Sequence, residues 1–265
     1  LGWQDQLASG FNYFVKAIYS NAKNTIIEMS EASQPFDYML ATGRPIGQFI
    51  GYQFDGFFQS YEEIAASPQQ FGLSNLAPGD MKYKDINQDG IVDQNDQTAI
   101  GHSTVPEITY SLSTGIAFKG IDLSLLFQGA ARSSVYMVSD LGWDNSWGNY
   151  FEEHYNRWTP ETALTATYPR FLQKSDGANQ NYYISDYWLR DGRYLRLINV
   201  QVGYALPKAV YRKLPVTNIR FFANAFNLLT WDEVKRVDPE SNPDRNSGQF
   251  YPQQRIVNFG INVGF

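Results

Sequence analysis

Hydrophobic and polar residues alternate one for one along several stretches of the chain, most clearly at its C-terminal end. In residues 257–265 the odd positions are all apolar, and the even positions hold asparagine and glycine. Successive side chains of a β-strand point to opposite faces, so this period of two predicts a strand with one apolar and one polar face. Similar patterns occur in residues 11–19, 108–118, 121–128 and 198–204. The chain is therefore predicted to consist largely of two-faced strands.

Residues 106–130 predict a β-hairpin. Lys119 and Gly120 separate two alternating runs, and a two-residue loop with glycine is typical of a tight turn between antiparallel strands. The alternation is weaker around residue 222, because Phe222 and Phe226 fall on the otherwise polar side. Six or seven strands are predicted, over residues 1–6, 11–21, 106–118, 121–130, 187–204, 217–230 and 252–265.

Two architectures use such strands, a soluble β-sandwich and a transmembrane β-barrel. Three features favour the barrel. Most of the strands are long enough to cross a bilayer when tilted, which takes about 9–11 residues. Their polar face carries small uncharged residues that suit a wide lumen. Very short connections also alternate with very long ones, as in outer-membrane barrels.

The number of strands indicates that the barrel is larger than this chain. An odd number does not close in the usual bacterial way, and an open sheet would leave bare edges in hydrocarbon. Residues 1–265 are therefore predicted to be the C-terminal portion of a bigger barrel. Aromatic residues near the strand ends, where interfacial girdles would lie, include Tyr187, Trp188, Tyr204, Trp231, Tyr251 and Phe265.

Composition removes several other classes of protein. The chain has no cysteine, which excludes a disulfide scaffold and any Cys-ligated metal site. The net charge of −6 argues against nucleic acid as a partner, since nucleic acid needs a basic face. No apolar run is long enough for a transmembrane helix. Residues 1–30 show no signal-peptide pattern, so the chain is expected to be either cytosolic or a product of something longer.

Eight motifs, in order, resemble those of SusC/RagA-type TonB-dependent transporters. Four resemble the closing strands of that family: YLRLINVQVGYALP (194–207), FFANAFNLLTW (221–231), VDPE (237–240) and YPQQRIVNFGINVGF (251–265). Four resemble its extracellular segments: GYQFDGFF (51–58), GDMKYKDINQDGIVDQND (79–96), RWTPET (157–162) and YPR (168–170). The resemblance runs from about Trp3 to Phe265.

This resemblance implies an all-β fold, the C-terminal strands of a large antiparallel transmembrane β-barrel of 22 strands with long extracellular loops. It implies non-enzymatic import of oligosaccharides or peptides, with a SusD-like surface lipoprotein above the barrel and the TonB complex supplying energy. The chain departs from the family in lacking the N-terminal plug, the TonB-contact segment and the early strands. Transport is therefore expected of a parent protein.

The direction of each strand follows because barrels of this family end in the periplasm. Residues 22–105, 131–186 and 231–251 are then expected outside the cell. Phe265, after alternating apolar residues, resembles the signal that the barrel-assembly machinery reads. The alternative is that Phe265 is one more girdle aromatic in contact with outer-membrane lipid.

Residues 85–96, DINQDGIVDQND, match the ligand spacing of a calcium loop within the segment 79–101. Oxygen ligands at alternating positions wrap one Ca²⁺, and Gly90 stands where the loop turns sharply. The alternative is a metal-free turn rich in Asp, Asn and Gly. The candidate ligands are Asp85, Asn87, Asp89, the Ile91 carbonyl, Asp93 and Asp96.

The aromatic segment 141–158 is the candidate for contact with a substrate or a lid. Three interpretations remain open: stacking on sugar rings, packing against a lipoprotein, and packing within a long loop. The residues concerned are Trp143, Trp147, Tyr150 and Trp158. No catalytic constellation is found, since His102 and His154 have no partner at metal or triad spacing. The competing function for the whole chain is a soluble secreted β-sandwich binding module with a structural calcium.

Overall fold

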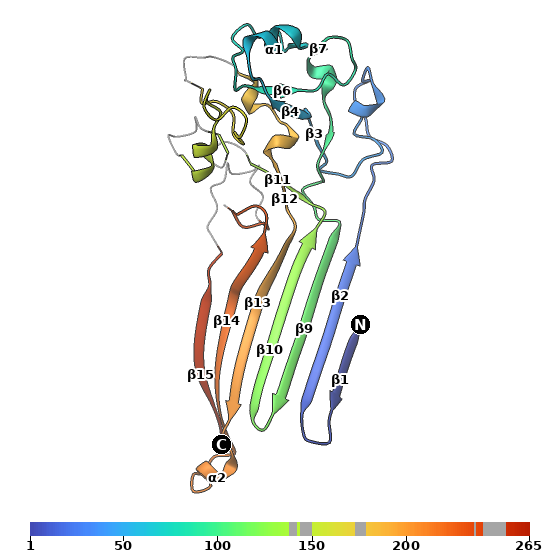
Figure 1. The fold of residues 1–265 in the computed structure, drawn as a ribbon. Coiled ribbons are helices and arrows are strands. Elements are labelled where there is room, and N and C mark those ends of the chain that lie inside the picture. The colour runs from blue at the N-terminus through green and yellow to red at the C-terminus, as the bar shows by residue number, and fades with distance from the viewer. Residues whose placement is uncertain (138–141, 144–149, 173–178, 236, 241–252) are drawn as a thin grey trace.

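A seven-stranded antiparallel sheet forms an elongated wall, with the long connections gathered at one end (Figure 1). The computed structural model describes residues 1–137, 142–143, 150–172, 179–235, 237–240 and 253–265. The sheet follows chain order, β1-β2-β9-β10-β13-β14-β15. Its strands are β1 (Gly2–Gln6), β2 (Asn12–Asn21), β9 (Ile108–Phe118), β10 (Ile121–Ala131), β13 (Tyr194–Ala205), β14 (Asn218–Asp232) and β15 (Ile256–Gly264). All seven candidate strands therefore lie in one sheet.

The two ends of the sheet differ, as the connection lengths predicted. At one end the strands are joined by residues 7–11, 119–120 and 206–217, the last containing α2 (Lys208–Tyr211). Lys119 and Gly120 both have positive φ, 47° and 86°, the combination that a tight hairpin turn requires. A β-carbon on Gly120 would lie 2.6 Å from the Ala205 carbonyl oxygen, so this position also needs glycine for space.

The predicted strand 187–204 is wrong in its first part, because β13 begins at Tyr194. Residues before it form a short 3-10 helix, η7 (Asp186–Trp188), and β12 (Leu189–Asp191), which pairs with β11 (Ser134–Tyr136). Trp188 is fully buried and Tyr187 packs on Phe54, so neither belongs to an interfacial girdle. Their burial draws this segment away from the sheet.

A β-bulge in β13 changes which residues share a face. The pairing with β14 shifts between Leu197 and Asn199, and the pairing with β10 shifts between Leu126 and Phe127. One extra residue reverses the alternation beyond it. Arg196 is paired with Gln128 and therefore lies on the polar face. The alternation that places Ile198 to Tyr204 does not continue through the bulge to Arg196.

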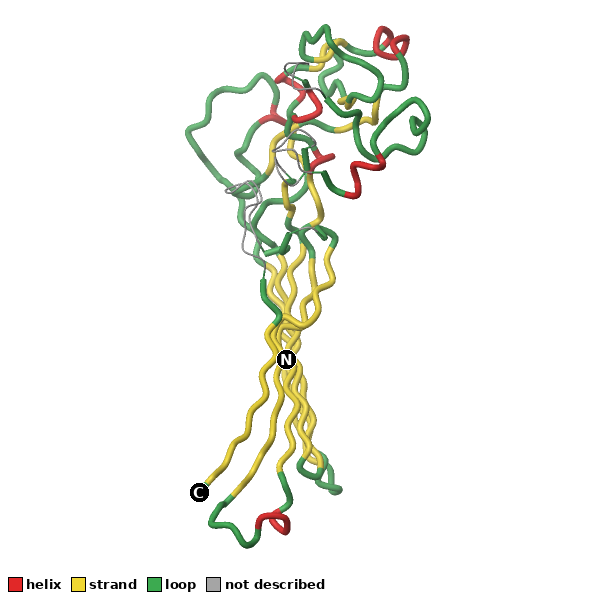
Figure 2. Tube along the Cα trace, turned by 90° about the vertical axis from the view of Figure 1, so that its left-hand side faces the viewer, coloured by secondary structure: helices red, strands yellow, loops and turns green. Residues whose placement is uncertain are grey.

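The long connections fold together into a head, defined here as the described parts of residues 22–107 and 132–192 (Figure 2). Short elements pair within it as β3–β8, β4–β6, β5–β7 and β11–β12. Those not yet given are η1 (Asp37–Met39), β3 (Phe49–Gly51), β4 (Phe54–Phe57), α1 (Tyr61–Ala66), β5 (Gln69–Gln70), β6 (Met81–Tyr83), β7 (Ile91–Val92), η2 (Gln94–Asp96), β8 (Thr98–Ile100), η4 (Glu152–Asn156) and η6 (Gln180–Tyr182).

The main apolar core of the described residues lies in the head. It joins residues from both long connections: Tyr52, Met81, Tyr83, Val92, Tyr168 and Trp188. Burial raises the pKa of the Tyr83 phenol, whose hydroxyl donates to the Gln180 carbonyl (2.8 Å) and stays neutral. Among the described residues, no helix is long and apolar enough to cross a membrane.

Candidate functional site

One face of the sheet exposes a continuous set of large apolar side chains, and we call it the apolar face. Phe259 is 83% exposed and its neighbours Val257 and Ile261 are more than half exposed. The set continues across the other strands with Phe221, Leu229, Val202, Tyr204, Ile116, Leu112, Val15 and Tyr19. A surface of this extent is unfavourable in water and is what the hydrocarbon of a bilayer requires.

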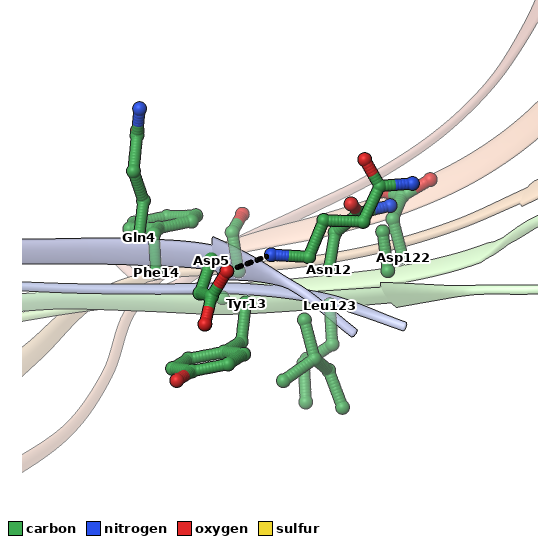
Figure 3. A pocket seen from close by; sticks show the side chains of 12 residues that line it. Gln4, Asp5, Asn12, Tyr13, Phe14, Asp122 and Leu123 are labelled. Atoms are coloured by element: carbon green, nitrogen blue, oxygen red, sulfur yellow. Dashed lines mark hydrogen bonds between the residues drawn. The ribbon is translucent and has the colours of Figure 1, made fainter. Parts of the chain in front are cut away.

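The opposite face, called here the polar face, carries small and amide side chains. Ser124, Gln201, Asn224 and Asn258 form one row across β10, β13, β14 and β15, since each is paired with the next. Figure 3 shows the contrast on strands β1, β2 and β10, with Gln4, Asn12 and Asp122 on one side of the sheet and Tyr13 and Leu123 on the other. Such a face suits a hydrated lumen.

Two aromatic rings lie flat on the polar face instead of projecting from it. A β-carbon on Gly260 would lie 2.3 Å from the Phe222 ring, and one on Gly115 would lie 2.4 Å from the Phe14 ring. These glycines therefore provide the room in which the rings lie against the wall. This also accounts for Phe222, which interrupts the alternation in the sequence.

The charges on the polar face are largely paired. Arg220 on β14 donates to both carboxylate oxygens of Asp122 on β10, at 3.0 and 2.5 Å. The pair passes over Gly203 on the strand between them, where a β-carbon would lie 2.1 Å from the guanidinium. The pair therefore bridges three strands of the wall.

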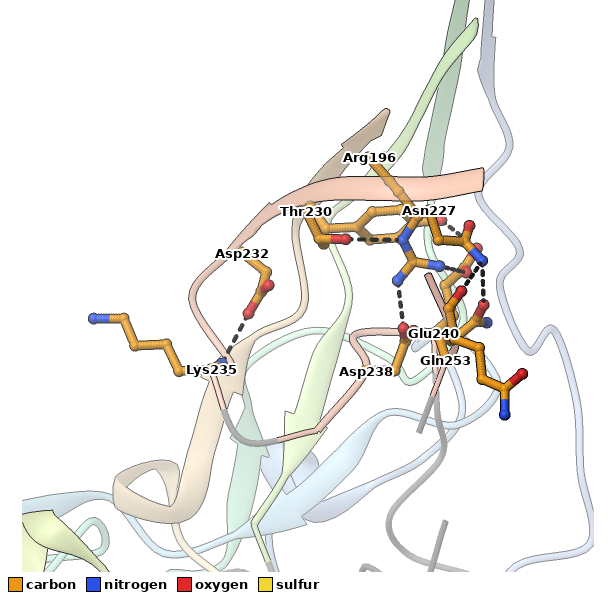
Figure 4. A network of polar contacts seen from close by, with 10 residues as sticks. Arg196, Asn227, Thr230, Asp232, Lys235, Asp238, Glu240 and Gln253 are labelled. Atoms are coloured by element: carbon orange, nitrogen blue, oxygen red, sulfur yellow. Dashed lines mark hydrogen bonds and ion pairs between the residues drawn. The ribbon is translucent and has the colours of Figure 1, made fainter. Parts of the chain in front are cut away.

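A second charged network joins the sheet to residues 237–240 (Figure 4). Arg196, with a side chain only 2% exposed, donates to Asp238 and to Glu240 at 2.5 Å each. Its Nε donates to the Thr230 hydroxyl at 3.1 Å, and the Tyr194 hydroxyl donates to Glu240 at 2.5 Å. Sequence reasoning noted the VDPE motif but missed this arginine, because the bulge that turns it to the polar face is not visible in the alternation.

The loop at 85–96 is closed by its own carboxylates. Asp85 accepts the N–H groups of Gln88 (2.6 Å) and Gly90 (2.8 Å). Asp96, fully buried, accepts from Ile86 (2.7 Å) and from Asp93 (2.8 Å). Residue 90 has φ +88°, as expected for the glycine of such a loop. Within the described ranges no three His, Cys, Asp or Glu side chains are grouped so as to hold a metal ion, and calcium stays a prediction.

The other candidate ligands also take part in the hydrogen bonds of this loop. Asn87 donates to Asp89 through its side-chain amide (2.9 Å), and Asp89 accepts the N–H of Ile91 (2.9 Å). Asp93 caps η2 by accepting from Asn95 (2.7 Å). Ile91 itself lies in β7, which pairs in parallel with β5.

Three of the four predicted contact aromatics can be placed, and Trp147 lies outside the described residues. Trp143 packs against the head core and Tyr182 at a ring distance of 5.0 Å. Trp158 lies over Gly79, and its indole N–H donates to Gln59 (3.3 Å). Tyr150 is 63% exposed beside His154. Packing inside the head accounts for Trp143 and Trp158, although Trp158 packs against the other long connection. Contact with a substrate or lid stays a prediction.

A buried ion pair that sequence reasoning did not find fastens the two long connections together. Asp80 has no exposed surface and accepts from the Arg170 guanidinium at 2.7 and 3.1 Å. It also accepts from the Asn181 amide (3.0 Å) and from the Ala77 N–H (2.9 Å). The residues belong to the motifs GD and YPR, which the sequence does not link.

Comparisons with known proteins find similar sequences among TonB-dependent receptors. No family model matches the chain. TonB-dependent receptor P26 of Formosa agariphila is 29% identical over 294 residues, covering 100% of this chain and 29% of the relative. TonB-dependent receptor P3 of the same organism is 25% identical over 272 residues, covering 93% of this chain and 26% of the relative. The chain thus spans less than a third of these relatives.

Solved structures agree on the fold. A chain of the RagAB peptide transporter superposes with a TM-score of 0.74 at 18% identity, covering 100% of this chain and 28% of that one. The RagAB peptide importer in its 'closed-closed' state gives 0.70 at 19% identity, with the same coverage. The chain therefore has the fold of a section of a large antiparallel β-barrel wall. Its resemblance to SusC/RagA-type TonB-dependent transporters, first seen in its motifs, is confirmed over its whole length.

Proposed function

We propose that this chain is the C-terminal part of the barrel wall of an outer-membrane nutrient importer, with no enzymatic activity of its own. The observation that carries the proposal is the pair of opposite faces on the same strands, one with exposed large apolar side chains and one with mainly polar side chains and glycines. The competing β-sandwich would need a second sheet over the apolar face, and the described residues provide none.

The two edges of the sheet support a larger barrel. Among the described strands, β1 and β15 each pair on one side only. Unpaired backbone N–H and C=O groups are too costly in hydrocarbon for such edges to face lipid. Strands from the rest of the parent protein would therefore pair with them and close a barrel of 22 strands, around the plug that the resemblance implies. The head would stand outside the cell and the short connections in the periplasm.

The transported material is proposed to be oligosaccharides or peptides, taken up with a SusD-like surface lipoprotein and driven by the TonB complex. RagAB, which contains a chain of the same fold, is a peptide transporter, and this supports peptides as one class. Phe265, 89% exposed at the end of the apolar face, is proposed as the assembly signal for the barrel-assembly machinery.

The full-length parent protein tests this proposal in its native bacterium. It should stay in the outer-membrane fraction, need detergent for extraction and copurify with a surface lipoprotein. Deleting its gene, or depleting TonB, should abolish growth on at least one oligosaccharide or peptide source. Extraction into aqueous buffer without detergent would contradict the membrane location and favour the soluble module.

A further inference from the structure

A pocket of about 330 Å³ lies where the polar face of the sheet meets the head. Its wall is one row of paired residues, Thr109 on β9, Ala130 on β10 and Tyr194 on β13. Ser133, just after β10, and Glu240, in the segment after β14, complete it from the side of the head. Its volume is at the small end of the range for small-molecule sites, about 300–1,000 Å³.

Several polar groups of this pocket are available to a ligand. Ser133 is only 5% exposed, and its hydroxyl makes no hydrogen bond to another described residue. A buried hydroxyl in this condition gains from any partner that enters. Thr109 and Gln128 also line the pocket, and their side chains have no hydrogen-bond partner within the described part of the chain. Between them these three groups can both donate and accept.

The charge of the pocket limits what it can bind. Glu240 is the one ionised side chain among its lining residues in the described part of the chain. Arg196 and the Tyr194 hydroxyl hold this carboxylate in place, and Arg196 is shared with Asp238, so the network keeps a net charge of about −1 at neutral pH. The carboxylate side chain is still 35% exposed and can accept from further hydroxyl groups. Anionic ligands are repelled here.

The remaining lining is suited to the C–H face of a ring. Tyr136 and Tyr194 contribute aromatic surface, and Pro106, Val135 and Pro239 contribute apolar surface. Aromatic and apolar side chains, combined with a few polar groups that fix the orientation of the ligand, are the usual lining of a small-molecule site.

We propose that this pocket is a subsite for one uncharged sugar ring of an oligosaccharide on its way into the barrel. The proposal rests on the proposed import function and narrows its substrate class. The sugar hydroxyl groups would bond to Thr109, Gln128, Ser133 and the Glu240 carboxylate, and the ring face would pack on tyrosine. Acidic sugars and acidic peptides are disfavoured by the same carboxylate.

The test uses the full-length transporter in detergent on an array of neutral oligomers of glucose, mannose, galactose and xylose, with uronic acid oligomers and peptides beside them. Neutral oligomers should be retained and uronic acid oligomers should not. Calorimetry with the best neutral oligomer should show Kd raised about tenfold by Gln128→Leu or Thr109→Val. Gln201→Leu, the same change on the polar face outside the pocket, should leave Kd within about twofold.

Two results would overturn the subsite. One is binding of peptides or acidic glycans with no neutral oligomer retained. The other is an unchanged Kd in both pocket variants, which would place the sugar elsewhere. Nutrient uptake measured in cells separates these results from failure of the import function, because TonB-dependent uptake of another nutrient would persist if the subsite alone were wrong.

Discussion

The sheet and the head use the same apolar residue types in opposite ways. On the sheet the large apolar side chains face outward, as Phe259 does with 83% of its surface exposed. In the head they point to a shared core, and Trp188 has no exposed surface at all. The difference is one of solvent: the head folds as a water-soluble protein does, whereas the sheet suits lipid on one side and water on the other.

The ion pairs of the two regions also differ in how far their side chains are exposed to solvent. Asp80 and Arg170 in the head have side chains 0% and 21% exposed, and Asp122 and Arg220 on the polar face have side chains 32% and 22% exposed. The first carboxylate depends fully on protein partners, while the second can also be hydrated. The head is thus fastened by buried contacts and the sheet by its strand pairing.

Replacing Trp188 with alanine should have the largest effect and should be confined to the head. Removing a buried tryptophan costs about 3–5 kcal/mol. The indole N–H also donates to the Asn181 carbonyl (2.9 Å), and that acceptor would lose its partner. Protease added to whole cells should then cleave the head while the barrel stays in the membrane. Tyr155→Ala, at a residue 82% exposed, is the control and should behave as wild type. Loss of the barrel as well would show that the two regions fold as one unit.

Phe259→Lys tests the apolar face, with Asn258→Lys as its neighbour on the polar face. A lysine facing lipid near the middle of a strand costs about 2–4 kcal/mol, whereas a lysine in a hydrated lumen costs much less. The amount of heat-modifiable protein in the outer membrane should fall for Phe259→Lys and stay near wild type for Asn258→Lys. Equal amounts for the two variants would contradict the assignment of the faces.

Calcium should have the smallest effect, limited to the segment 79–101. If the loop binds Ca²⁺, saturation at a hundredfold excess over Kd stabilises it by about 2.7 kcal/mol. Limited proteolysis of this segment in the full-length protein should accelerate when EGTA replaces calcium. Asp85→Asn should remove that response. Its amide keeps an oxygen acceptor for one of the two N–H groups, those of Gln88 and Gly90, which the carboxylate accepts with separate oxygens. Identical cleavage of the wild-type protein in calcium and in EGTA would rule out a stabilising metal.

The sequence alone determined the strands, the short turns and the end of the sheet at which the long connections lie. Period-two alternation identified residues such as Val257 and Phe259 as one face, because neighbouring side chains of a strand must point to opposite sides. The turn at Lys119 and Gly120 could also be predicted, because its conformation depends on residues that are adjacent in the chain. The loop at 85–96 was recognised from spacing alone, since its hydrogen bonds join residues close in the chain.

Only the tertiary structure decided which residues depart from these patterns. Trp188 looked like a girdle residue and lies in the head core, and Arg196 reached the polar face through a bulge that changes the register with two neighbouring strands. Asp80 and Arg170 stand 90 residues apart and meet in one buried pair. Alternation reports the two sides of a single strand. Contacts between distant segments depend on how the whole chain packs, and local patterns do not encode them.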